Sequence, residues 1–297
     1  MARRYPVFQF VAHVVMLLVT ISVILPFLLL FLSSITDEAA LLNNGYSFFP
    51  KDFSLAAYKY IFDSGDKIFR AYGMTILYTV VGTLAGTAIS ALFAYPLSLK
   101  NLPFRKAANF FVFFTMLFNG GLVPFYILWS TYLGVKDTIW GQILPGMLVS
   151  GMNILLIRAY FTSSIPDTLF EAAQIDGAGQ TRIFTTIVLP LGKPILVTIG
   201  TFTALNYWNN WTNGLYFINK GTDLYTIQNL LNRMVTDLQY LSTNSNLSAS
   251  MAEELARIPS TGVQMAIAFI AILPILILFP FLQKYYAKGI ALGAVKG

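Results

Sequence analysis

The segment at residues 160–194 combines charge, helix signals and nearby glycines. Pro166 suits the first position of a helix, and Asp167 would follow in the first turn, where a negative charge complements the helix dipole. Gly177 and Gly179 allow the backbone to turn. The pattern predicts two short amphipathic helices joined at a glycine turn.

The chemistry of this segment is recognition rather than catalysis. Glu171 is the most prominent charge of its first helix, and a short stiff helix can insert into a groove on another protein. A helix that lies at a membrane interface would satisfy the same pattern. Spacing alone therefore leaves both alternatives open.

A second set of residues combines amides with aromatic rings, which suit a ligand that has hydroxyl groups and flat apolar faces. All of these residues fall within long apolar stretches, where polar groups must face protein or water. The candidates are Tyr207, Trp208, Asn209 and Trp211, with Asn153 and Asn119 from two other stretches.

Each of these candidates has a structural alternative. The tryptophans would also suit an aromatic belt at the membrane interface. Asn153 could make a hydrogen bond between helices, and Asn119 could support a helix break beside Gly120 and Gly121. Helical spacing places Tyr207 near Trp211, and Asn206 near Asn209 and Asn210.

Groups typical of catalysis are scarce. The chain has no cysteine and a single histidine, so thiol chemistry is excluded and a histidine metal site is not expected. No G-x-x-x-x-G-K-[ST] sequence is present to cradle a phosphate. We therefore expect no catalytic residue, no metal site and no cofactor in this chain, and any energy source must lie in another subunit.

The composition is that of an integral membrane protein. Apolar residues make up 56% of the 297 positions and charged residues only 11%, with a mean hydropathy of +0.66. A span needs about 20 apolar residues, and windows without Asp, Glu, Lys or Arg predict six. They are 11–32, 73–97, 108–129, 139–159, 195–217 and 262–282. In the second, Gly82 and Gly86 form a GxxxG pattern that lets helices approach closely.

The charges predict the orientation. With the N-terminus inside, the inner segments hold 11 of the 19 basic residues and 3 of the 13 acidic ones, as the positive-inside rule requires. The net positive charge then reports topology, and we expect no nucleic-acid partner. Both termini and the segment 160–194 are predicted to be cytoplasmic, and residues 33–70 and 218–261 extracytoplasmic. Within the latter, 224–241 has helical spacing.

The sequence resembles a known family at several motifs. Glu171-Ala172-Ala173-x-x-Asp176-Gly177-Ala178, followed by Leu189-Pro190, is similar to the EAA loop of ABC importer permeases. Phe118-Asn-Gly-Gly-Leu-Val-Pro, Trp208-Asn-Asn-Trp and the tail 288–297 resemble the carbohydrate-uptake branch, which includes the second maltose permease subunit and related oligosaccharide permeases. The resemblance covers nearly the whole chain.

This resemblance implies an all-α integral membrane fold of the type I ABC importer permeases, in a bacterial cell membrane. The implied partners are a second, homologous permease subunit, two cytoplasmic ABC ATPases that bind ATP and Mg, an extracytoplasmic sugar-binding protein and membrane lipid. The matched EAA residues would form the helix that couples to the ATPase, and the ligand of the amide and aromatic candidates would be a sugar.

An ABC permease for another solute stays open as an alternative. An ATP-independent carrier is disfavoured, because the charge-free windows that predict the spans contain no residue to bind an ion or a proton. These windows are 5–36, 71–99, 107–135, 138–157, 194–219 and 258–283.

Overall fold

The computed structural model describes residues 6–63, 65–219, 222–243 and 260–294, and these residues form helices and connecting turns without a strand. They fall into two compact units, one comprising 1–68 with 230–275 and the other 69–229 with 276–297. Each unit is described by itself. Three helices, α4, α14 and α16, continue from one unit into the other.

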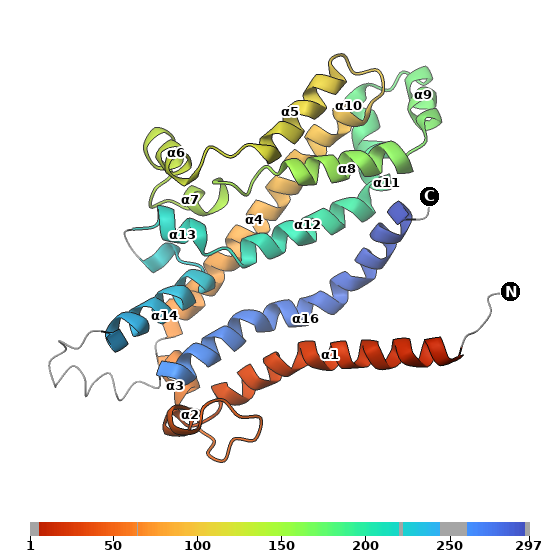
Figure 1. Ribbon diagram of the computed structural model, residues 1–297. Helices are drawn as coiled ribbons and strands as arrows, with labels where there is room; N and C mark the ends of the chain where they lie inside the picture. The colour runs from red at the N-terminus through yellow and green to blue at the C-terminus, as the bar shows by residue number, and fades with distance from the viewer. Residues whose placement is uncertain (1–5, 64, 220–221, 244–259, 295–297) are drawn as a thin grey trace. The chain divides into compact units, whose positions relative to one another are not determined.

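The first unit contains α1 (Pro6–Ser34), α2 (Glu38–Asn44), α3 (Ala56–Asp63) and the first part of α16 (Ser260–Ala294) (Figure 1). The carboxylate of Glu38 accepts hydrogen bonds from the backbone N–H groups of Thr261 and Gly262, at 2.9 and 2.8 Å. Glu38 thereby satisfies two donors at the N-terminus of α16, which the helix itself leaves unpaired.

The second unit is built on α4 (Gly65–Ser98), beside which α8 (Gly151–Ser164) and α12 (Lys193–Trp208) lie (Figure 1). The predicted close approach at the glycines of α4 is confirmed. A Cβ on Gly82 would come within 2.2 Å of the Tyr207 ring, and one on Gly86 would lie 3.0 Å from the Leu148 carbonyl oxygen. Larger residues at these positions would hold the neighbouring segments away from α4.

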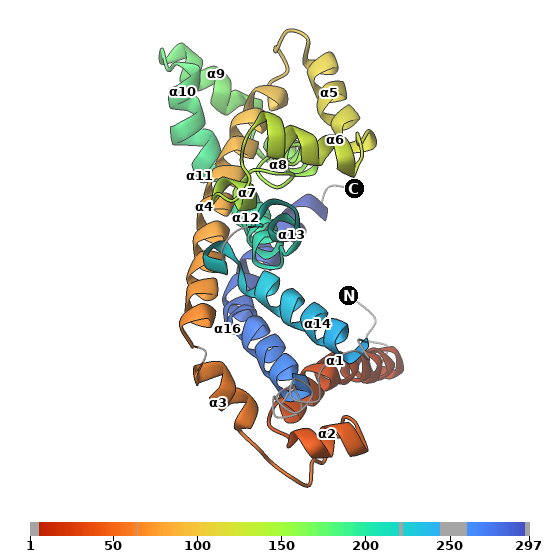
Figure 2. The ribbon, with the colours of Figure 1, turned by 90° about the vertical axis from the view of Figure 1, so that its left-hand side faces the viewer.

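The ends of this unit carry shorter helices. Figure 2 shows α9 and α10 near the C-terminal end of α4. The bounds are α5 Arg105–Leu117, α6 Leu122–Ile127, η1 Leu128–Tyr132, α7 Trp140–Ile143, α9 Asp167–Ile175, α10 Gln180–Ile183, η2 Phe184–Val188, α11 Leu189–Leu191, α13 Thr212–Phe217, η3 Thr222–Leu224 and α14 Ile227–Thr243.

Three of the predicted spans, the third, fourth and fifth, are interrupted helices. The third breaks between α5 and α6, where Gly121 has φ +88°, and the two halves are bent by 108°. The fourth breaks between α7 and α8 at Pro145 and Gly146, where the latter has φ +69°. Left-handed glycine and proline both disfavour a continuous helix. A search for stretches without Asp, Glu, Lys or Arg does not reveal such breaks, because glycine and proline are uncharged.

The structure compares with the six predicted spans as follows. Among the described residues, Phe8–Ser34 and Gly65–Ser98 are long and apolar enough to cross a membrane, and two bent helix pairs pass the same test together. The range 262–282 lies within α16. Crossing of the membrane by all six ranges stays a prediction.

The helix predicted at 224–241 is confirmed as α14, which begins at Ile227. Its start is set by a reciprocal cap. The Thr226 hydroxyl accepts the Asn229 backbone N–H at 3.1 Å, and the Asn229 side-chain oxygen accepts the Thr226 backbone N–H at 3.3 Å. Such an exchange satisfies two donors that a helix start otherwise leaves free.

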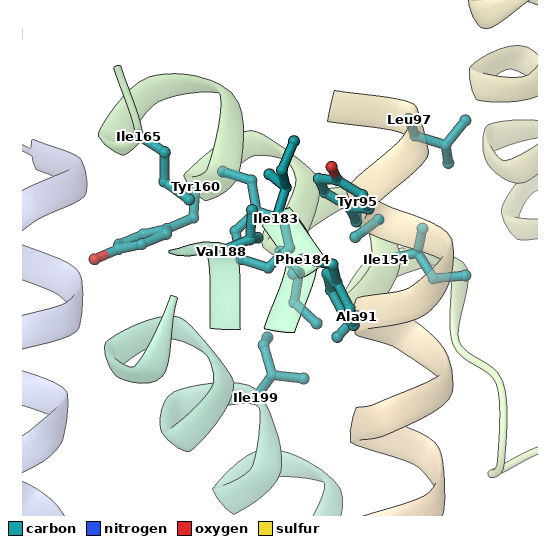
Figure 3. Packing of buried hydrophobic residues seen from close by; sticks show 13 residues of the cluster. Ala91, Tyr95, Leu97, Ile154, Tyr160, Ile165, Ile183, Phe184, Val188 and Ile199 are labelled. Carbon is teal, nitrogen blue, oxygen red and sulfur yellow. The ribbon is translucent and has the colours of Figure 1, made fainter. Parts of the chain in front are cut away.

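The second unit has an apolar core at the end where α4 finishes (Figure 3). α4 contributes Tyr95, α8 contributes Ile157 and Phe161, and the chain after α9 contributes Ile183 and Phe184. The Tyr95 and Phe184 rings lie 5.1 Å apart. This core joins the segment 160–194 to α4 and α8.

Candidate functional site

The first candidate region is the docking segment, which we define as α9 and α10 with the turn between them, residues 167–183. α9 begins at Asp167, so Pro166 precedes the first helical residue rather than occupying it. Asp167 nevertheless lies in the first turn, as predicted. Its carboxylate pairs with the Lys100 ammonium in the turn that follows α4, and both side chains are more than half exposed.

The turn at the end of α9 depends on one glycine. Gly177 has φ +76°, a conformation that costs glycine little and other residues more. The Ala178 N–H donates to the Ala173 carbonyl oxygen at 2.9 Å, which closes the helix end. Gly179 has φ −71°, so it does not use the freedom that the sequence suggested for both glycines.

The two faces of the docking segment differ in burial. Phe170, Ala173 and Ala178 pack against the apolar core. Glu171, Ala172, Asp176 and Gly177 are exposed, and Ile175 is 86% exposed. The exposed face therefore offers two carboxylates and an apolar side chain next to small residues. A helix with this surface suits contact with another protein.

The docking segment is fastened to α4 at both ends. At one end is the ion pair of Lys100 and Asp167, and at the other the Tyr95 hydroxyl donates to the Gln180 side-chain oxygen at 2.6 Å. Tyr95 is 7% exposed. Exposed ion pairs contribute about 0–1 kcal/mol, so the hydrogen bond of the buried Tyr95 is the firmer attachment. A cavity of about 450 Å³ lies between the two attachments.

The second candidate region is a polar pocket of about 440 Å³. It is formed by the segment before α8, one face of α8, and the end of α12 with the residues after it. Its lining residues are Gly146, Met147, Ser150, Asn153, Thr203, Asn206, Tyr207, Asn209, Asn210 and Thr212.

Three of the predicted sugar-binding residues line this pocket, namely Asn153, Tyr207 and Asn209. Trp208 and Trp211 do not. α12 ends at Trp208, so the predicted helical neighbourhood of Tyr207 and Trp211 is wrong. Trp208 is buried with its ring 6.4 Å from that of Tyr72, whereas Trp211 is 41% exposed.

The lining residues have different hydrogen-bonding roles. The Tyr207 hydroxyl donates to the Ile143 carbonyl oxygen at 2.8 Å, and Tyr207 is only 1% exposed, so it forms part of the pocket wall with its hydroxyl already paired. The Asn153 amide donates to the Thr203 hydroxyl at 3.3 Å, which matches the predicted alternative of an interhelical bond. Among the described residues, no side-chain partner is found for Asn206 or Asn209, and both are exposed. Their amides are available to a ligand.

Asn119 supports a helix break, the alternative that the sequence left open for it. Its side-chain oxygen accepts the Gly121 backbone N–H at 2.8 Å, within the turn between α5 and α6. Asn119 does not line the polar pocket.

Behind the polar pocket lies a buried amide network, which we define as Gln142, Asn213, Thr226 and Asn229. The Asn229 side-chain oxygen accepts from the Gln142 amide at 3.2 Å and from the Thr226 hydroxyl at 2.8 Å. The Asn213 amide donates to the carbonyl oxygens of Gln142 and Pro145, at 3.3 and 3.1 Å. All four residues are at most 6% exposed. Buried polar groups fix a structure when they are hydrogen-bonded in this way.

The network reaches the pocket through Asn210. Its carbonyl oxygen accepts the Thr226 hydroxyl at 3.2 Å, and its side-chain oxygen accepts the Asn213 backbone N–H at 3.2 Å. The chain just after α12 is therefore held by Thr226, which precedes α14, and by Asn213 of α13.

Sequence reasoning missed several residues of this region. Ser150, Met147 and Thr203 line the pocket without having been predicted to do so. Ser150 precedes α8 and accepts the Asn153 backbone N–H at 3.4 Å, so a serine before Gly151 was a usable helix-start signal. The distant partners Gln142 and Asn229 gave no local signal.

The pocket lining contains no charged residue. Among the residues that the structure describes, no group of three or more His, Cys, Asp or Glu could hold a metal ion. Hydroxyl and amide groups beside an aromatic ring are what a neutral sugar requires.

The fold and the site define a class of protein, a helical membrane component with an exposed charged helix and an uncharged polar pocket. The chain belongs to the family of binding-protein-dependent transport system inner membrane components, whose model matches residues 1–292.

Curated relatives support this family over nearly the whole chain. The chain is 38% identical to Protein LplC of Bacillus subtilis (strain 168), covering 92% of this chain and 90% of that protein. It is 34% identical to the polygalacturonan/rhamnogalacturonan transport system permease protein YtcP of the same organism, covering 98% of each.

A solved structure is similar as well. It is a crystal structure of a bacterial ABC transporter involved in the import of the acidic polysaccharide alginate, with a TM-score of 0.80 and 30% identity over 96% of this chain and 99% of that one. The predicted type I ABC importer permease fold is confirmed. Members of this family are permease components, and ATP hydrolysis takes place in separate ATPase subunits.

Proposed function

We propose that this chain forms half of the translocation pathway of an ATP-driven importer for an oligosaccharide. Its partners would be a homologous permease subunit, two cytoplasmic ABC ATPases and an extracytoplasmic sugar-binding protein. Both termini and the docking segment would lie on the cytoplasmic side of a bacterial cell membrane. The bias of basic residues toward the inner segments supports this orientation.

The observation that carries the proposal is the docking segment. Glu171, Ala172, Asp176 and Gly177 are exposed, while Ala173 and Ala178 attach the same segment to the core. A helix held on one face and free on the other can transmit a force from a bound partner. We assign this face to the ATPase cleft.

Movement of the docking segment would reach the spans through its attachments to α4. Closure of the ATPases on ATP would move α9, and Tyr95 with the apolar core would carry that displacement to α4 and α8. The two permease subunits would then enclose a cavity open alternately outward and inward. Shifting such an equilibrium from 1:99 to 99:1 needs about 5.5 kcal/mol of differential binding.

The polar pocket is the proposed place of sugar contact in this subunit. Asn206 and Asn209 offer exposed amides, and the buried Tyr207 forms part of the wall beside them. Trp208 and Trp211 are not part of this proposal, because neither lines the pocket.

An acidic oligosaccharide is the second candidate substrate. The names of two similar proteins refer to polygalacturonan and alginate, which carry carboxylates. Because no basic side chain lines the pocket of this chain, a neutral sugar is favoured here, and any cation for an acidic sugar would come from the partner permease.

The test is the charge reversal Glu171→Lys in the complete transporter reconstituted in proteoliposomes. We expect membrane insertion to be normal and uptake to fall roughly 100-fold, since burying a repelled charge at an interface costs about 3 kcal/mol. Uptake and ATP hydrolysis are measured with a neutral gluco-oligosaccharide and an oligogalacturonate, each with its binding protein.

A matched control is Asp66→Lys, which reverses an exposed acid in the first turn of α4. We expect its uptake to stay near the wild-type rate. Normal uptake by the Glu171→Lys transporter would refute the coupling role of α9.

A further inference from the structure

Two arginines converge on one backbone oxygen where α4 ends. The Nε atoms of Arg105 and Arg158 donate to the Leu97 carbonyl oxygen at 3.0 and 3.2 Å. Arg105 is the first residue of α5, and Arg158 lies in the second half of α8. We call these two residues the arginine pair.

The arginine pair has no acidic partner in the described part of the chain, where neither side chain has a carboxylate oxygen within 4.0 Å. Each guanidinium uses its Nε for the Leu97 oxygen, and the Nη groups carry further donors. Two like charges that share one acceptor repel each other, and an anion would relieve that repulsion. Planar guanidinium groups suit phosphate oxygens in particular.

A strained aromatic residue adjoins the arginine pair. Phe104 has φ +56°, a left-handed conformation that is unfavourable for a side chain of this size. It is also 87% exposed. Local strain that turns a large apolar ring outward is typical of a functional position.

We propose that the arginine pair binds the phosphate of an anionic phospholipid headgroup. Phe104 would then lie among the lipids at headgroup depth, where aromatic rings are favoured. Basic pockets between membrane helices recognise anionic headgroups in this manner. This inference rests on the proposed membrane topology, which places residues 98–106 at the inner leaflet.

A lipid suits the site better than a free phosphate, because the site continues into an apolar surface. α5 begins at Arg105, and several of its aromatic side chains are exposed, with Phe110 at 65% and Phe111 at 67%. Acyl chains can lie along these rings while the phosphate meets the two guanidinium groups. A free anion would gain nothing from them.

The test compares the complete transporter in nanodiscs of phosphatidylcholine alone and with phosphatidylglycerol. Retained phosphatidylglycerol is counted by mass spectrometry, and the melting temperature is measured in both lipids. We expect the wild type to retain this lipid and melt higher in its presence. The double variant R105Q/R158Q should retain at least about tenfold less, because both charge-assisted contacts to the phosphate are removed, and it should melt at one temperature in both lipids.

Three controls separate lipid binding from simple capping of α4. Arg182→Gln removes an exposed arginine of the docking segment and should leave retention unchanged. Phe104→Gly relieves the strained backbone, so it should fold normally and retain less lipid than the wild type. Inorganic phosphate added to phosphatidylcholine discs should not raise the melting temperature.

Several outcomes would overturn the proposal. Equal lipid retention by the wild type and the double variant would make the arginine pair a helix cap only. If the double variant melts lower than the wild type by the same amount in both lipids and still retains the lipid, the arginine pair is likewise a helix cap only. Stabilisation by inorganic phosphate alone would assign the site to a soluble anion. Because the nanodiscs expose phosphatidylglycerol on both faces and no transport is measured, failure of the proposed import function would leave these readings unaffected.

Discussion

The docking segment and the polar pocket are built in opposite ways. The docking segment is one stretch of 17 residues, 167–183, with its charged face in solvent and two polar attachments, to Tyr95 of α4 and to Lys100 in the turn that follows. The polar pocket collects residues from three segments, and a buried amide network holds it from behind. A surface that must meet a partner can be encoded locally, whereas a cavity for a small ligand needs support from distant segments.

This contrast predicts that the pocket is the more fragile of the two. The largest effect is expected from Gly214→Ala, because the new Cβ would come within 2.2 Å of the Asn229 side chain. Asn229 is 4% exposed and tied to Gln142, Thr226 and the Trp211 carbonyl oxygen. Displacing it leaves buried polar groups unpaired, so we expect a loss of about 3 kcal/mol in stability.

The measurement is thermal unfolding of the purified transporter together with sugar uptake. Gly120→Ala is the matched control, because a Cβ there would have no atom within 4 Å. Unchanged unfolding of the Gly214→Ala transporter would show that the amide network does not hold the pocket.

A smaller effect is expected at the pocket surface. Asn209→Ala removes an exposed amide whose side chain takes no part in the hydrogen bonds of the buried amide network. We expect the half-saturating sugar concentration for uptake to rise about tenfold, which corresponds to one lost hydrogen bond to the ligand of roughly 1–1.5 kcal/mol. Stability should not change.

Uptake kinetics over a range of sugar concentrations check this prediction, with Asn119→Ala as a control outside the pocket. Wild-type kinetics for Asn209→Ala would move the sugar site elsewhere, to the partner subunit first of all.

The smallest effect is expected at the attachment of the docking segment. Tyr95→Phe removes only the hydroxyl that donates to Gln180, and Gln180 is exposed enough to bond to water instead. One such bond is worth about 1 kcal/mol, so sugar moved per ATP hydrolysed should fall about fivefold with little loss of stability.

Tyr160→Phe is the comparison, because Tyr160 belongs to the same apolar core and lies 8% exposed. If both variants lower the amount of sugar moved per ATP hydrolysed equally, the hydrogen bond of Tyr95 has no particular part in coupling. The apolar core alone would then transmit the motion.

The sequence determined the docking segment almost completely. Pro166, Asp167 and Gly177 act on their immediate neighbours, since helix starts and left-handed turns depend on the nearest few residues. Composition likewise fixed the membrane class, and the resemblance of the EAA motif to ABC importer permeases agreed with the family found. In the pocket, Asn153, Tyr207 and Asn209 could be predicted as residue types suited to a sugar.

The tertiary structure decided what the residues near the end of α12 do. A continuous helical pattern placed Tyr207 beside Trp211, but α12 ends at Trp208 and Asn210 turns into contacts with Thr226 and Asn213. Asn213 is only three residues from Asn210, but Thr226 is 16 residues away, so local spacing could not reveal the Thr226 contact. Free energy from long-range hydrogen bonds outweighed helix propensity there, and only the folded chain shows where that happens.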